Sequence, residues 1–403
     1  MEQPQMHVQD DPTNFLEISV IAEMLQIIEQ IETNCKGKVG EDIVNERIKQ
    51  VAYAKILCNI YHKDIKYLIK AYSALGIAYF DISYFEQAQE HLLNAFKLNE
   101  NLTDEDNLNM KEQQIKILIN LAKCYLENDK VNPALQISER SLKMNKAIFG
   151  DDHISNGDIY YVISKANTKL GNYKTAIENL KEMYEIYEKA EGSNSEKTAK
   201  ILMEIGQVYE LWEMYNDAID NYEKSYKIWE QIISNDEYEV LFHLSIKLAD
   251  LYQKNNNADK AYSLLCQTDE KYGERTNRST KQKFIYQKNR IKYSMFLKDA
   301  KDLYLEEYLR LESILTEADE NPNALAKTCI SIAVIFLDRR DKEKCLEYYH
   351  KAARIFENNG NETRLAEVKA KIEDIESQQF DDANNEEEDE RNDNDGYDDE
   401  DND

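Results

Sequence analysis

A pair of small residues twelve positions apart recurs along this chain, and this repeat constrains the fold more than any other feature of the sequence. The pairs are Gly76 with Ala88, Ala122 with Ala134, Ser164 with Ala176, Gly206 with Ala218, Ala249 with Ala261, and Ala333 with Cys345. Successive first members lie 46, 42, 42, 43 and 84 residues apart, and 84 is twice 42. A further, degenerate unit is therefore expected at Ile291 and Leu303.

Small residues at this spacing indicate two antiparallel helices packed closely, because larger side chains would hold the backbones apart. An aromatic residue follows three positions after the first small residue in most units, at Tyr79, Tyr125, Tyr209, Tyr252 and Phe336, whereas one unit has Asn167. A single helix pair cannot bury its apolar face, so neighbouring pairs must stack. The pattern predicts one all-α solenoid in place of several globular domains.

The turn chemistry and the composition agree with helix pairs. The stretch KLGNYKTAIENL, residues 169–180, places Gly and Asn between two apolar-periodic segments, as a short connection between helices requires. The chain of 403 residues has only 11 Gly and 4 Pro, while 32% of its residues are charged. This composition favours long helices over strands.

Two segments resemble the tetratricopeptide repeat family, namely SALGIAYFDISYFEQAQEHLLNAF (73–96) and EIGQVYELWEMYNDAIDNYEKSY (204–226). The period of 42 is longer than the 34 residues usual in that family. In this respect the chain is similar to kinesin light chains and to several ciliary tetratricopeptide repeat proteins. The resemblance implies an all-α, right-handed superhelical solenoid that binds other proteins.

The domain organisation follows from the extent of the repeats. The last segment contains 14 acidic residues and one Arg, so it is too charged to pack. The expected parts are a disordered N-terminus (1–14), a helical N-terminal cap or degenerate repeat (15–60), tandem repeats (61–360), a C-terminal capping helix (361–380) and a disordered acidic tail (381–403).

Several classes of function are disfavoured. A net charge of −28 argues against nucleic acid as a partner, and no apolar stretch or leader indicates a membrane, so a cytoplasmic protein is expected. The six cysteines show no metal-ligand spacing, and phosphate-binding and hydrolase motifs are missing from the sequence. We therefore expect no catalytic residues, cofactor or metal.

The resemblance also implies a concave groove lined by positions 2, 5, 9, 12 and 13 of each first helix, with the small residue at position 8. Across seven units these are 35 positions, of which six are acidic and ten are lysine. The expected groove is net positive within an acidic protein. The lysines are Lys70, Lys116, Lys123, Lys165, Lys169, Lys200, Lys254, Lys288, Lys292 and Lys327.

From these positions we select a candidate partner-binding site. It combines lysines with nearby apolar side chains and comprises Lys70, Ile77, Phe80, Lys116, Lys123, Tyr161, Lys165, Lys169, Lys200 and Met203. Such a surface would attract an acidic or extended peptide segment of another protein. The acidic tail of this chain is a second candidate, as an intramolecular and autoinhibitory competitor.

The function expected is a non-catalytic scaffold or adaptor, with a ciliary, axonemal or microtubule-associated assembly as its setting. One alternative is a cargo adaptor of the kinesin light chain type, although the N-terminal region lacks a long heptad run. The other is a co-chaperone. Its peptide clamp needs Lys and Asn or Arg in consecutive repeats, and only Lys116 and Asn120 are present.

Overall fold

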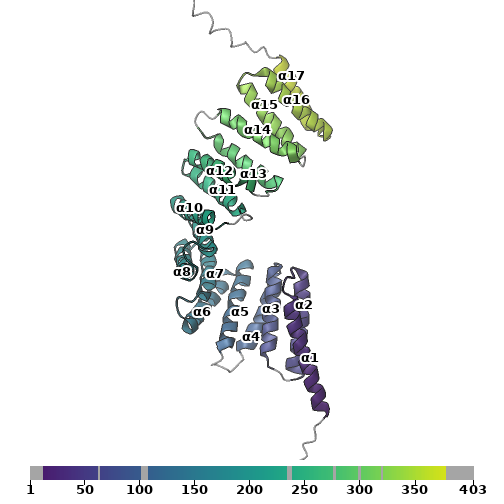
Figure 1. Ribbon diagram of the computed structural model, residues 1–403, viewed down its shortest axis with the longest axis vertical. Helices are drawn as coiled ribbons and strands as arrows, with labels where there is room; N and C mark the ends of the chain where they lie inside the picture. Colours follow the sequence, from purple (N-terminus) through teal and green to yellow (C-terminus); the bar gives the residue numbers. More distant parts are fainter. Residues whose placement is uncertain are drawn as a thin grey trace, which may run out of the picture. The chain divides into compact units, whose positions relative to one another are not determined.

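The computed structural model describes residues 12–61, 64–100, 108–233, 238–275, 278–297, 301–318 and 321–377. Over these ranges the chain forms the α-helices α1–α17 and the short 3-10 turn η1, with no strand (Figure 1). The all-α fold class expected from the repeat is confirmed. The expected disordered tail, 381–403, and residues 1–11 of the expected disordered N-terminus lie outside the described residues. Helix α1 begins at Pro12.

The chain divides into two compact units, and unit 1 extends to Ile232. Within unit 1 each helix packs on the next, and the first helices of neighbouring pairs also touch, α3 with α5 and α5 with α7 (Figure 1). The helices are α1 (Pro12–Asn34), α2 (Glu41–Asn59), α3 (Lys66–Asp81), α4 (Phe85–Glu100), α5 (Leu108–Glu127), α6 (Val131–Phe149), α7 (Ser155–Lys169), α8 (Tyr173–Glu191), α9 (Glu196–Leu211) and α10 (Tyr215–Ile232).

Unit 2 begins at Ile233 and repeats the same arrangement. Helix α13 packs on both α12 and α14, and α17 closes the series against α16. None of the helices in the described ranges is long and apolar enough to cross a membrane. The elements are α11 (Glu239–Lys254), α12 (Ala258–Tyr272), η1 (Gly273–Arg275), α13 (Thr280–Ser294), α14 (Lys301–Ala318), α15 (Pro322–Asp338), α16 (Lys342–Asn358) and α17 (Glu362–Ser377).

The small residues lie where the two helices of each pair come closest. All twelve are buried, and Ala88, Ala122, Ala134 and Ala333 have no exposed surface. A Cβ atom added to Gly76 would lie 2.6 Å from Leu92 Cγ and 3.1 Å from the carbonyl oxygen of Ala88. The repeat therefore marks the helix contact, as expected. The degenerate unit also forms a helix pair, α13 with α14, in which Ile291 is buried and Leu303 half-buried.

The turns between paired helices repeat one backbone geometry. Seven positions after each first small residue the chain adopts a left-handed conformation, with φ values from 54° to 77°. The next residue donates its backbone N–H to the carbonyl oxygen five residues earlier, as Asn172 does to Asn167 and Met214 does to Tyr209, both at 2.9 Å. This is the helix end for which glycine is favoured. Only Gly171 is a glycine; the others are Ser83, Asp129, Glu213, Asn256 and Arg340.

Because a non-glycine residue is strained in this conformation, Glu213→Gly is expected to stabilise unit 1 by about 0.5–1 kcal/mol. Gly171→Ala makes the opposite change at the same position of another turn. Because an added Cβ would meet no atom within 4 Å, only the backbone strain would affect the stability. It should destabilise by about 1 kcal/mol. Urea unfolding followed by circular dichroism measures both. Changes of the same sign in the two variants would contradict this account of the turns.

Candidate functional site

The ten candidate residues all lie on first helices of unit 1. Helix α3 carries three of them, α5 two, α7 three and α9 two. Lys70, Lys116, Lys169 and Lys200 are exposed, and Lys123 and Lys165 are half-buried. Of the apolar members, Ile77 is exposed, whereas Phe80, Tyr161 and Met203 are half-buried. The structure thus places side chains that a partner can reach on four consecutive helix pairs.

Most of these lysines already have an anionic neighbour. Lys165 Nζ donates to Glu204 Oε2 at 2.6 Å, across the gap from α7 to α9. Its ammonium lies 5.3 Å from the ring centre of Tyr161, whose hydroxyl also donates to Glu204 at 3.2 Å. Burial works to lower the pKa of Lys165, but the hydrogen bond and the charge of Glu204 outweigh it and raise the pKa. Lys165 is therefore a positive charge held between two repeats.

Three other lysines of the candidate site also form ion pairs. Lys169 donates to Asp129 at 2.8 Å and to the carbonyl oxygen of Leu126 at 2.7 Å. Lys116 pairs with Glu112 at 2.6 Å, and Lys200 pairs with Glu196, both within one helix. Pairs of this kind are exposed and contribute little stability, so a partner can replace them.

These ion pairs reduce the positive charge that the sequence predicted for the surface. The carboxylates that pair with these lysines stand outside the five groove positions of their repeats, so the net charge estimated from groove positions did not include them. They are Glu112, Asp129, Glu196 and Glu204. Lys123 has a groove-position neighbour instead. Burial raises the pKa of Asp81, and the nearby charge of Lys123 opposes that shift.

Unit 2 contains a hollow that is lined by none of the ten candidate residues. It has a volume of about 350 Å³ and lies between α13, α14 and α15. Two of the ten lysines at predicted groove positions line it, Lys288 on α13 and Lys327 on α15. Neither forms an ion pair in the described part of the chain, and no carboxylate is among the described lining residues. The hollow therefore brings together two predicted groove lysines that are not among the ten residues of the candidate site.

The floor of this hollow is apolar. Ile291 and Leu311 belong to one buried cluster, against which Phe284 and Tyr308 pack. Ile291 occupies the position where other repeats have a small residue, so the helices of this pair cannot approach as closely. In the sequence, the feature that marks this hollow is the degenerate unit, in which the small residues of the repeat are replaced. Two unpaired ammonium groups above an apolar floor suit a segment that combines acidic and apolar side chains.

Comparison with known proteins supports the fold. A family model for the tetratricopeptide repeat matches residues 113–189 and 163–231. The C-terminal part of a tetratricopeptide repeat-containing protein from Cytophaga hutchinsonii is 11% identical with a TM-score of 0.50, covering 71% of this chain and 95% of that chain. No curated protein matches the sequence.

Two further solved structures are similar at lower TM-scores. BtubC from P. vanneervenii is 18% identical, with a TM-score of 0.49 and coverage of 57% of this chain and 89% of that chain. Repeats of a putative kinesin light chain from Podosopora anserina are 18% identical, with a TM-score of 0.45 and coverage of 52% and 97%. Repeats of the matched family serve as protein-interaction scaffolds. Residues 113–231, the part of the chain that the family model matches, are therefore tetratricopeptide repeats.

Proposed function

We propose that this chain is a non-catalytic scaffold or adaptor that binds acidic, extended segments of partner proteins. The observation that carries the proposal is the hollow of unit 2, where Lys288 and Lys327 stand above an apolar floor. Ammonium groups without a carboxylate partner can contact an incoming Asp or Glu without first breaking an ion pair. An apolar side chain of the same segment would fill the hollow below them.

The lysine surface of α3, α5, α7 and α9 is proposed as a separate contact region in unit 1. Three of its lysines, Lys116, Lys169 and Lys200, hold Glu and Asp neighbours at exposed sites, where an exchange of ion-pair partners changes the free energy little. Apolar anchors such as Ile77 and Phe80 would add to the affinity of a bound segment. Binding at both regions would fall as salt concentration rises, since it depends on exposed charges.

The period of the repeats supports a proposal for the cellular assembly in which the chain acts. We propose a ciliary, axonemal or microtubule-associated assembly because the spacing of 42 residues is similar to that of ciliary tetratricopeptide repeat proteins and kinesin light chains. Cargo binding of the kinesin light chain type is the alternative within the same class. A co-chaperone role is less well supported, because Asn120 donates its side-chain N–H to Lys116 O at 2.9 Å and Lys116 pairs with Glu112.

Reversing both charges of the hollow, Lys288→Glu with Lys327→Glu, is expected to weaken binding of an acidic peptide by about tenfold or more, because attraction becomes repulsion. The chain without 381–403 would be titrated into fluorescein-labelled peptide 381–403 and into a labelled poly-glutamate 20-mer. Fluorescence anisotropy measures the affinity. Lys369→Glu with Lys371→Glu, on α17, makes the same change of net charge in unit 2 and should weaken binding less than twofold. The proposal fails if neither peptide binds or if the two double variants behave alike.

The acidic tail is proposed as an internal competitor for the same surfaces. The full chain should then bind the labelled peptides more weakly than the chain without 381–403, by about threefold or more, since a tethered segment has a high effective concentration. Anisotropy at 50 mM and 300 mM NaCl tests this, and the difference between the two chains should shrink at high salt. Equal affinities for the two chains at both salt concentrations would rule out competition by the tail.

A further inference from the structure

A second and larger cavity lies in unit 2, on a different face of α13. It has a volume of about 720 Å³ and is bounded by α12, η1, α13 and α14. Helix α13 contributes Lys283, Tyr286, Gln287 and Arg290, which share one helix face by their spacing. The lysine hollow uses the neighbouring face, through Phe284, Lys288 and Ile291. The two sites can therefore be tested separately.

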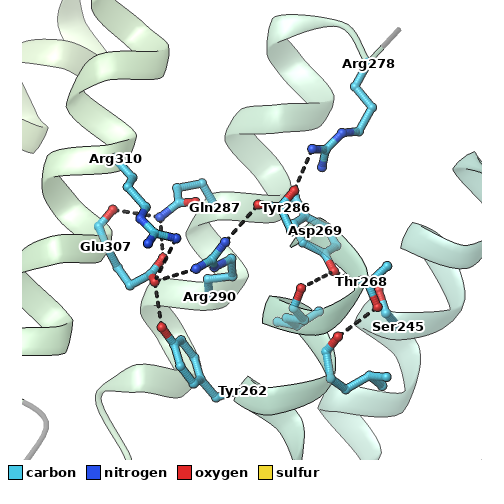
Figure 2. Close-up of polar contacts among 12 residues, drawn as sticks. Ser245, Tyr262, Thr268, Asp269, Arg278, Tyr286, Gln287, Arg290, Glu307 and Arg310 are labelled. Carbon is cyan, nitrogen blue, oxygen red and sulfur yellow. Dashed lines mark hydrogen bonds and ion pairs between the residues drawn. The ribbon is translucent and has the colours of Figure 1, made fainter. Parts of the chain in front are cut away.

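Arginine side chains and two carboxylates form a network beside this cavity (Figure 2). Asp269 accepts hydrogen bonds from Arg278 at 2.6 Å and from Arg290 at 2.8 Å. Figure 2 shows Arg290 placed between Asp269 and Glu307, and its second terminal nitrogen donates to Glu307 Oε1 at 2.7 Å. Arg310 approaches the same Glu307 oxygen at 3.8 Å. Three guanidinium groups thus share two carboxylates.

Glu307 has little capacity left to accept further hydrogen bonds. Glu307 also accepts from the Tyr262 hydroxyl at 2.6 Å and from the Gln287 side chain at 2.6 Å. On the donor side, Nε of Arg278 and Nε of Arg290 are buried and have no acceptor among the described residues. The Arg290 side chain is only 4% exposed and that of Arg278 10%. A desolvated positive charge with unused donors is unfavourable until an anion occupies the site.

The geometry points to a ligand site: we propose that this cavity binds a small molecule carrying one oxyanion group, a phosphate monoester or a carboxylate, through Arg278, Arg290 and Arg310. Guanidinium groups bind such planar or tetrahedral oxyanions with paired, charge-assisted hydrogen bonds. The volume is in the range of sites that hold small organic molecules. The rings of Tyr262 and Tyr286, with Ile314, offer apolar surface for the remainder of the ligand.

The rim of the cavity limits which anions fit. Glu270 and Glu274 line it and are exposed, and no ion pair joins either of them to an arginine in the described residues. Lys283 and Arg310 also line the cavity and are exposed, so the exposed lining contains both signs of charge and suits a ligand with one anionic and one cationic group better than one with negative charge at both ends. Phosphoethanolamine and 4-aminobutanoate, each with one oxyanion and one ammonium group, are therefore suitable probes, and inorganic phosphate tests the anion alone.

The test uses the full chain and needs no partner protein. Each probe is titrated by isothermal calorimetry, and the melting temperature is followed against sodium chloride of equal ionic strength. At least one probe should bind saturably and raise the melting temperature by about 2 °C or more. Arg278→Gln and, at a mostly exposed position, Arg310→Gln should each weaken binding about tenfold or more. The probe that binds identifies the group as phosphate or carboxylate.

Lys369→Gln removes a positive charge from an exposed site on α17, a helix that does not line the cavity, and should leave probe binding unchanged. Circular dichroism in chloride alone shows whether each arginine variant is folded, and Arg310→Gln provides a second test if Arg278→Gln is not. The proposal is overturned if no probe raises the melting temperature beyond the chloride reference. It is equally overturned if folded arginine variants bind the probes as the unaltered chain does.

Discussion

Close contact between two helices at a pair of small residues is the interaction on which the rest of this structure depends. Gly76 against Leu92 and Ala88 shows how little room remains at such a contact. Once this spacing is fixed, the aromatic side chain three residues later packs beside it, as Tyr79 does against Ala88 and Leu92, and the turn between the helices is held to one geometry. The same residues that bring the helices together therefore set which face of each helix is buried and which is left for partners.

Where the small pair is lost, the structure gains polar and hollow sites. In the pair α13–α14, Ile291 and Leu303 stand at the contact positions, and both cavities discussed for unit 2 border α13. One is an apolar hollow with two lysines; the other adjoins a network that joins α12, α13 and α14 through Asp269, Arg290 and Glu307. This network joins the helices through polar contacts, whereas the regular repeats join them through small apolar residues. Both proposed binding sites therefore border the helix pair that departs from the repeat pattern.

The sequence predicted the fold well, but it did not predict how the charged residues of the candidate site are paired. Periodicity is local information, so the helices, the small contacts and the turn at Gly171 could be read from spacing alone. The partners of the lysines could not, because Glu204 reaches Lys165 from the next repeat and Asp129 reaches Lys169 from the preceding turn. Arg290 and Glu307 are separated by seventeen residues and fit no known motif, and only their helix packing brings them together.

The central claim, that the small-residue contact governs each helix pair, is tested most directly by Gly76→Val, measured as the free energy of unfolding in urea. The added side chain would overlap Leu92, so the account predicts a loss of about 1–3 kcal/mol. Lys70→Val, at an exposed position of the same helix, should change the stability by less than about 0.5 kcal/mol. If Gly76→Val were as stable as the unaltered chain, the close contact would not be the constraint that organises this fold.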